Sequence, residues 1–354
     1  MKKLISLLLC FTLICSMLTA CGSSGGDSGD ETAAGELNMY IWTEYVSEDV
    51  IHRFEEETGI KVNVSYYSSN EDLLAKLKAE EEGAFDIIQP SDYLVEDLIK
   101  QGMIQELDLS KLKNFDNIGS QYKDPAYDPG NKYSIPYLGG VAGIAVNTAN
   151  IKDSVTSYAD LFNAKFKDDI VVLDDFRAII GITERSMGLS MNETDPDKLK
   201  EVQSKLLTLK DNIKLFDSDS PKSALISGEC NLAVCWAAEI ALAMEENPDI
   251  KIVFPSDGAY VFIDNWSIPK GAKNTENAYK WIDFILDADN MAESLQVYPY
   301  MCCNTAAIEK MDESYTGNEA KNVPSSAVES GEFISNLDTD TMKIYNDMWN
   351  ELKK

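Results

Sequence analysis

The chain has 354 residues, with 60 acidic side chains against 31 basic ones and a formal net charge of −29. This acidity disfavours nucleic acid as a partner, because phosphates are bound by Lys and Arg. It is compatible with a cationic ligand, although acids on solvated helix faces account for much of it. The length suffices for two ordinary domains, each with its own hydrophobic core.

The first residues have the pattern of an export signal. Two lysines precede an apolar stretch that ends near Leu18, which predicts a signal peptide over residues 1–20 that is too short to be a mature membrane span. The tetrapeptide LTAC resembles a bacterial lipobox, in which Cys21 becomes the lipidated first residue; an ordinary signal peptide with an incidental cysteine is the alternative. Residues 21–36 then have the Gly/Ser composition of a flexible tether. We therefore expect an extracytoplasmic protein anchored to the bacterial cell membrane, in the periplasm or on the outer face.

From Leu37 onward the hydrophobic period changes repeatedly between that of a strand and that of a helix. LNMYI predicts a first strand, and Ser47 and Gly59 are placed to begin and end a helix. IKVNVSYY alternates as a strand, residues 70–82 have a helical pattern, and FDIIQP predicts a further strand. Strands that alternate with helices indicate parallel α/β layers.

Each predicted strand runs into polar or aromatic residues just before the next helix begins. This happens at the stretches WTEY, QPSDY, DDFR and WAAE. In open α/β sheets the ligand crevice lies beyond the carboxyl ends of the strands. A fifth stretch, AYVFIDNWSIP, carries Tyr260, Phe262, Asp264 and Trp266 along a probable strand. We expect the following side chains at the strand ends to line the crevice: Trp42, Glu44, Tyr45, Ser91, Tyr93, Asp175, Arg177, Trp236 and Glu239.

Several kinds of chemistry have no residues to support them. His52 is the only histidine, which removes Ser-His-Asp and Cys-His nucleophile systems and any multi-histidine metal site. There is no P-loop, and the glycines of LGGVAG are misplaced for a dinucleotide fingerprint. We therefore expect no metal, no cofactor and no enzymatic activity. Paired carboxylates that hydrolyse sugars remain an alternative, because acids are plentiful.

Four cysteines follow the predicted lipidation site, and their spacing matches neither a disulfide framework nor a zinc motif. We interpret them as small buried residues, with a disulfide left open. They are Cys230, Cys235, Cys302 and Cys303.

The combination of carboxylates and large aromatic rings at the strand ends is suited to an organic cation. A protonated amine needs a carboxylate partner once water is excluded, because an unpaired buried charge costs several kcal/mol. Its methylene groups prefer apolar walls, and an aromatic face adds a cation–π attraction of about 0.5–2 kcal/mol. Several acids separated by rings therefore describe a slot for an extended polycation.

Particular stretches resemble the spermidine/putrescine-binding proteins of polyamine ABC importers. They are YIWTEYV, FEEETGIKV, FDIIQPSDYLVEDLIKQGMIQELD, YSIPYLGGVAGIAVN, DDFR, NLAVCW, IDNWSIP and GEFISNLD, which together cover essentially everything from residue 37. The resemblance implies a two-lobed α/β fold of the type II periplasmic-binding-protein kind, with the ligand cleft between the lobes. The lobes expected are residues 37–140 with 264–308, and residues 141–263 with 309–354.

The resemblance also implies which residues contact the ligand. Glu44, Asp175, Glu239 and Asp264 would pair with ammonium groups, and most of the other side chains would form the walls. It further implies a monomer that delivers a polyamine to an ABC permease and its ATPase. The expected set of ligand contacts is Trp42, Thr43, Glu44, Tyr45, Ser91, Tyr93, Asp175, Trp236, Glu239, Phe262, Asp264 and Tyr300.

Some positions depart from the family pattern. Ala178 stands where spermidine-binding relatives carry a glutamate, Phe262 stands where a tryptophan is usual, and Ile334 lies near the place of a late glutamine. Glu239 lies where putrescine-preferring relatives have an acid, whereas Glu44 favours acceptance of spermidine. The choice between triamine and diamine stays open. The alternatives to polyamine binding are another organic cation or amine and an anchored carbohydrate hydrolase.

Overall fold

The computed structural model describes residues 35–354. The predicted signal peptide, the predicted lipidation site Cys21 and most of the predicted tether lie outside the described residues. Among the described helices, none has both the length and the apolar character that crossing a bilayer requires.

A small parallel sheet forms the first part of the described chain. Its order is β2-β1-β3, and Glu36 of β1 lies opposite Lys61 of β2. A helix follows each strand, so the predicted alternation of strand and helix is confirmed. The strands are β1 (Glu36–Trp42), β2 (Lys61–Tyr67) and β3 (Ile87–Ile88), and the helices are α1 (Glu48–Thr58), α2 (Asn70–Ala79) and α3 (Asp92–Gln101).

The ends of α1 and α2 confirm some of the predicted signals and correct others. Gly59 ends α1 in the left-handed conformation at φ 68°, and its N–H donates to the Glu55 carbonyl at 2.8 Å. Ser47 is the residue before α1, but its side chain makes no capping hydrogen bond. Helix α2 stops at Ala79, earlier than predicted, because Glu80 is extended. Residues 80–82 are exposed, so no burial would stabilise a further turn.

The second sheet is mixed, which corrects the expectation of purely parallel layers. Its order is β11-β9-β4-β7-β5-β6, with β8 and β10 also pairing with β4. Strands β5, β6 and β7 are parallel, whereas β4 runs antiparallel to both β7 and β9. The strands are β4 (Ile135–Asn147), β5 (Ile170–Val172), β6 (Ile213–Phe216), β7 (Leu232–Trp236), β8 (Ile250–Val253), β9 (Tyr260–Trp266), β10 (Met301–Cys302) and β11 (Glu332–Phe333).

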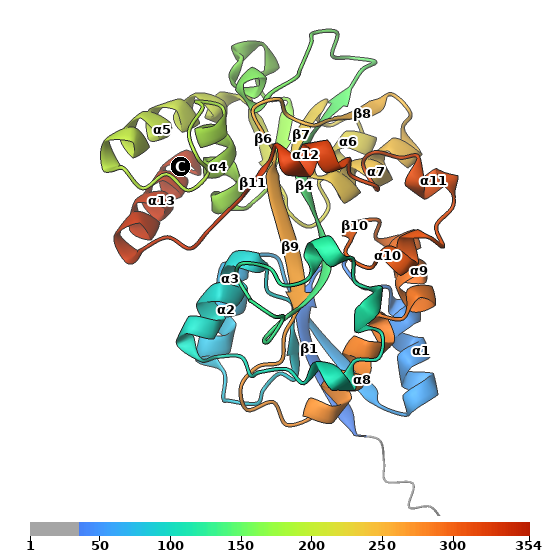
Figure 1. The fold of residues 1–354 in the computed structure, drawn as a ribbon. Coiled ribbons are helices and arrows are strands. Elements are labelled where there is room, and N and C mark those ends of the chain that lie inside the picture. Colours follow the sequence, from blue (N-terminus) through green and yellow to red (C-terminus); the bar gives the residue numbers. More distant parts are fainter. Residues whose placement is uncertain (1–34) are drawn as a thin grey trace, which may run out of the picture. The chain divides into compact units, whose positions relative to one another are not determined.

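Strands β4 and β9 pair with each other in the second sheet, and the chain at the end of β9 reaches the first sheet. Every residue of both strands is buried, because each has neighbours on both sides and small or apolar side chains along most of its length. Asp264 of β9 forms a bridge to Ser91, and Ser267, directly after β9, forms a bridge to Ile88. Figure 1 shows β9 as a long strand that begins beside β11, with which it pairs, and ends near β1. A residue in β9 can therefore contact segments of both sheets.

The remaining helices flank the two sheets. Helix α13 packs on α4 and α5, and α8 packs beside β1 (Figure 1). Their bounds are α4 (Phe176–Arg185), α5 (Pro196–Leu209), α6 (Lys222–Ile226), α7 (Ala237–Glu246), α8 (Thr275–Ile285), α9 (Ala288–Val297), α10 (Thr305–Ile308), α11 (Glu313–Thr316), α12 (Ser325–Glu329) and α13 (Thr339–Leu352). Short 3₁₀ turns lie at Leu109–Lys111, Phe115–Asn117, Ser120–Tyr122, Tyr158–Phe162, Ala164–Phe166 and Lys210–Asn212.

The four cysteines after the predicted lipidation site are buried and form no disulfide in the described chain, so their interpretation as small core residues is confirmed. Burial raises the pKa of the Cys302 thiol to about 12. A buried, protonated thiol reacts slowly, because the thiolate is the nucleophile.

A substitution at Gly139 can test whether the close approach of β4 and β9 requires glycine. A Cβ atom added there would lie 2.5 Å from the Phe262 carbonyl oxygen, which is backbone and cannot move aside cheaply. We expect Gly139→Ala to lower the free energy of unfolding by about 1–3 kcal/mol in urea titrations. Gly143→Ala is the matched control, because its added Cβ would meet only side-chain atoms of Ile240 and Ile252. An equal loss for both variants would contradict the close-approach argument.

Candidate functional site

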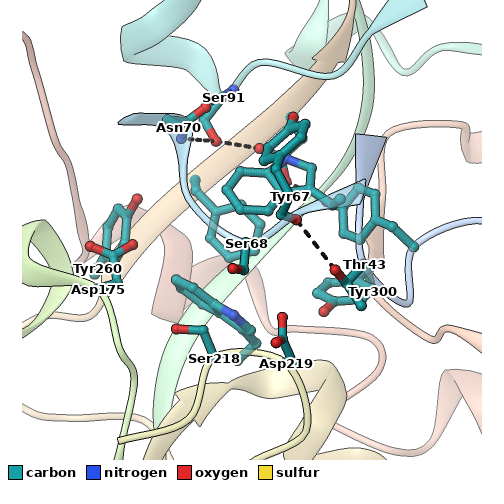
Figure 2. Close-up of a pocket in the computed structure, with 15 residues that line it drawn as sticks. Thr43, Tyr67, Ser68, Asn70, Ser91, Asp175, Ser218, Asp219, Tyr260 and Tyr300 are labelled. Atoms are coloured by element: carbon teal, nitrogen blue, oxygen red, sulfur yellow. Dashed lines mark hydrogen bonds between the residues drawn. The ribbon is translucent and has the colours of Figure 1, made fainter. Parts of the chain in front are cut away.

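A cavity lies where the ends of several strands meet the loops that follow them. It holds about 540 Å³ of space between protein atoms, part of it open to solvent. Figure 2 shows side chains from both sheets pointing into it. The lining residues are Trp42, Thr43, Tyr45, Tyr67, Ser68, Asn70, Ser91, Asp175, Ser218, Asp219, Trp236, Tyr260, Phe262, Asp264 and Tyr300.

Asp264 is the buried acid of this cavity. It lies in β9 with 2% of its surface exposed, and it accepts hydrogen bonds from the Tyr45 hydroxyl at 2.5 Å and from the Ser91 hydroxyl. Ser91 in turn accepts a hydrogen bond from Asn70 Nδ2 at 2.9 Å (Figure 2). Burial raises the pKa of the Asp264 carboxyl to about 7, although the two hydroxyl donors oppose the shift. The carboxyl is held in place but lacks a cationic partner among the described residues.

Aromatic rings form much of the remaining wall. Trp42 packs against Tyr67 with centroids 4.6 Å apart, and Tyr45 packs edge-on against Tyr300 at the same separation. On another side of the cavity, Trp236 packs edge-on against Phe262 at 4.9 Å. These contacts restrict the rotamers of the rings, so the wall is preformed.

Asp175 is a second acid in the cavity wall, at the start of α4. Its carboxylate accepts a hydrogen bond from the Ala178 N–H at 3.0 Å and so caps the helix. Burial raises the pKa of Asp175, while the Ala178 N–H and the nearby charge of Arg177 oppose the shift. Burial and the charge of Asp175 together raise the pKa of Glu71 to about 7. A cation in the cavity would therefore be stabilised on this side as well.

The structure brings most of the predicted site residues together. Three of them, Glu44, Tyr93 and Glu239, do not line the cavity. The predicted residues that do line it are Trp42, Thr43, Tyr45, Ser91, Asp175, Trp236, Phe262, Asp264 and Tyr300.

Glu44 and Glu239 both bind the ammonium group of Lys222. The Lys222 Nζ atom lies 2.6 Å from Glu44 Oε2, 2.9 Å from Glu239 Oε2 and 3.1 Å from Glu239 Oε1. Burial raises the pKa of Glu239 to about 7, although the charge of Lys222 opposes that shift. The two glutamates that the sequence offered to a ligand thus have a partner within the chain.

Tyr93 and Arg177 lie beside the cavity rather than in its wall. The Tyr93 hydroxyl donates to Glu71 at 3.2 Å, and the Arg177 guanidinium carbon lies 5.7 Å from the Tyr93 ring centroid. Arg177 is fully buried and donates to the Ser335 carbonyl at 2.9 Å. These contacts connect α3 and α4 to the segment before α13.

Sequence reasoning missed several lining residues and Lys222. Ser68 and Asn70 follow the end of β2, and Ser218 and Asp219 follow the end of β6. The rule that ligands bind beyond strand ends would have found them, had it been applied to these two strands as well. Lys222 has no such signal, because it stands at the start of a short helix among many surface lysines.

The arrangement is suited to a small organic cation. Asp175, Asp219 and Asp264 supply carboxylates, and the rings supply apolar faces that attract positive charge. Within residues 35–354, no three His, Cys, Asp or Glu side chains converge as metal ligands.

Comparison with known proteins agrees with this geometry. The family model described as bacterial extracellular solute-binding protein matches residues 49–323. The spermidine/putrescine-binding periplasmic protein of Salmonella typhimurium is 34% identical over 342 residues, covering 96% of this chain and 97% of its own length.

Solved structures show the same fold. A putative spermidine/putrescine ABC transporter protein from Listeria monocytogenes aligns with a TM-score of 0.86 and 32% identity, covering 90% of this chain and 98% of its own. A lipoprotein of Treponema pallidum aligns with a TM-score of 0.79 and 27% identity, over 90% of this chain and 99% of its own. The expected α/β fold of the type II periplasmic-binding-protein kind is confirmed, as is the resemblance to spermidine/putrescine-binding proteins. The chain belongs to the bacterial extracellular solute-binding protein family.

Proposed function

We propose that this protein captures polyamines, spermidine or putrescine, in the cavity and delivers them to an ABC permease and its ATPase. The observation that carries the proposal is Asp264, a buried acid that lies among aromatic rings and forms no salt bridge with any residue of the described part of the chain. A buried carboxylate without a partner raises the free energy of the folded protein, and an ammonium group supplies the missing charge. The names of the Salmonella and Listeria relatives, both of which include spermidine and putrescine, support the same ligand class.

Capture would proceed by closure of two lobes around the ligand, without any covalent step. The lobes are residues 37–140 with 264–308 and residues 141–263 with 309–354, and they would close about the strands near Gly140 and Asp264. The lining residues Trp42 and Trp236 belong to different lobes, which supports a ligand held between the two lobes.

The proposed location is the outer side of the cell membrane, with the monomeric protein anchored through a lipid on Cys21. The LTAC motif and the similarity to a Treponema pallidum lipoprotein support the anchor. Residues 21–36 would then give the body reach to dock on the permease.

The first test is calorimetric titration of the full chain in detergent, stripped of carried-over amines by unfolding and refolding. We expect one-to-one binding of putrescine or spermidine at micromolar strength or better, about −8 kcal/mol. The amine should be recovered unchanged, as judged by NMR of the ligand. Absence of heat with both amines would contradict the proposal, and binding of a different amine would select the alternative cation.

The ring walls can be tested with a pair of tryptophans. Trp236→Ala removes a ring that lines the cavity, so we expect polyamine binding to weaken at least tenfold, about 1.4 kcal/mol. Trp349 is the control, because it lies on α13 against Phe216, with centroids 5.4 Å apart, and does not line the cavity. Trp349→Ala should leave the affinity within twofold, and equal losses would remove Trp236 from the wall.

The cost of burying Asp264 predicts a pH-dependent stability. Its pKa is about 7 in the folded protein against 3.8 for an ordinary aspartate, so the folded state retains a proton that the unfolded chain releases between these values. Stability is therefore lost as pH rises from about 4 to 7, and the loss persists above pH 7. Without amine, we expect Asp264→Asn to match the wild-type protein near pH 4 and to exceed it by about 1–4 kcal/mol at pH 8.

Chemical unfolding at several pH values measures this difference. Asp116→Asn is the control, because the Asp116 side chain is fully exposed, and it should show no such trend. A difference between the Asp264→Asn variant and the wild-type protein that stays constant with pH would show that Asp264 ionises as an ordinary carboxylate.

A further inference from the structure

The Lys222 ammonium group is enclosed by acids of two distant segments. Glu44 belongs to the turn after β1, where it has a left-handed backbone at φ 51°, and Glu239 lies in the first turn of α7. The Lys222 side chain is 18% exposed and that of Glu239 only 3%. Burial lowers the pKa of Lys222, but the nearby carboxylates outweigh it and the net shift is upward. Lys222 thus remains a charged ammonium between the buried Glu239 and Glu44, whose side chain is 37% exposed.

This ion cluster adjoins the cavity. Thr43 and Tyr45, the chain neighbours of Glu44, line the cavity, and so does Asp219, three residues before Lys222. Tyr300 also lines the cavity; burial raises the pKa of its phenol first, followed by the negative charges of Glu239, Asp264 and Glu44. The cluster therefore borders the cavity near Thr43, Asp219 and Tyr300.

A terminal amine of a polyamine, bound in the same place, would also be a primary ammonium group paired with carboxylates. Lys222 has the same ammonium headgroup on a comparable chain of methylene groups. A ligand ammonium entering this end would meet a like charge with the two glutamates already committed. The approach of these like charges is unfavourable, because partial burial reduces their screening by water.

The acids that remain match a shorter ligand. Asp264 and Asp175 line the cavity, and neither forms a salt bridge within the described chain. Asp219 also lines the cavity but is exposed to solvent. Two buried or half-buried carboxylates pair with two ammonium groups, and a third ammonium would lack a desolvated partner.

We propose that Lys222 acts as a built-in ammonium that fills one end of the polyamine site and so selects a diamine over a triamine. This inference rests on the proposed polyamine function and deepens it. Lys222 is a specificity-determining residue here: it takes up Glu44 and Glu239, which would otherwise bind the extra ammonium of spermidine.

The test compares putrescine and spermidine by calorimetry on the full-length wild-type protein and on Lys222→Met. Methionine keeps most of the side-chain length and removes the charge. We expect the wild-type protein to prefer putrescine. In Lys222→Met, the ratio of the spermidine Kd to the putrescine Kd should fall at least tenfold, because Glu44 and Glu239 become free for the third ammonium.

Two further variants separate charge from packing. Lys222→Met combined with Glu239→Gln removes one of the freed acids, so much of the gain for spermidine should disappear. Lys321→Met is the matched control, because Lys321 is 11% exposed and pairs with Glu245 at 2.5 Å, outside the cavity lining. It should keep the wild-type ratio. If Lys222→Met fails to fold by circular dichroism, Lys222→Gln takes its place, since the amide can donate to the glutamates without charge.

The outcomes distinguish this inference from the proposed function. If the wild-type protein binds neither amine, the polyamine function fails and the inference fails with it. If the wild-type protein binds both but prefers spermidine, or if removal of the Lys222 charge leaves the ratio within twofold, only the inference is overturned. A shift of the same size in the Lys321→Met control would also overturn it.

Discussion

The hydrogen bonds that hold the Asp264 carboxyl are the interaction on which the site depends. They join β9 to the turn after β1 through Tyr45 and to the start of α3 through Ser91. A buried acid is unfavourable in a strand whose every residue is buried, and the two hydroxyls offset only part of that cost. The aromatic wall and the second acid, Asp175, surround the same space. The folded protein therefore holds negative potential where its sheets approach each other.

Much of the fold could be predicted because its signals are local. The apolar run LNMYI of β1, the alternating sequence IKVNVSYY that contains β2, and Gly59 at the end of α1 each depend on a few neighbouring residues. The mixed direction of the second sheet could not be read in this way, because strand direction depends on pairings between segments far apart, such as Leu138 with Asp264. The early end of α2 depends on the absence of buried contacts, which a helical pattern alone does not reveal.

The site residues also differ in whether local sequence or tertiary structure determines their role. Trp42, Asp175 and Trp236 were predicted from their place at strand ends, and the structure brings them to one cavity. Glu44 and Glu239 have the same local signal, yet their carboxylates are bound by Lys222, which is 178 residues from Glu44 in the sequence. Local chemistry thus identified the acids, while the tertiary structure determines which of them are available to a ligand.

The raised pKa of Asp264 also makes cation binding in the cavity depend on the pH of the solvent. At a pH near its pKa of about 7, a substantial fraction of the protein molecules carry a proton on this carboxyl. Under the proposed function, an arriving ammonium group would favour the ionised form, so each capture event would release a fraction of a proton. The measured heat of binding would then include the ionisation heat of the buffer. Acidification of the medium would weaken amine binding, because protons and amines would compete for the same oxygen atoms.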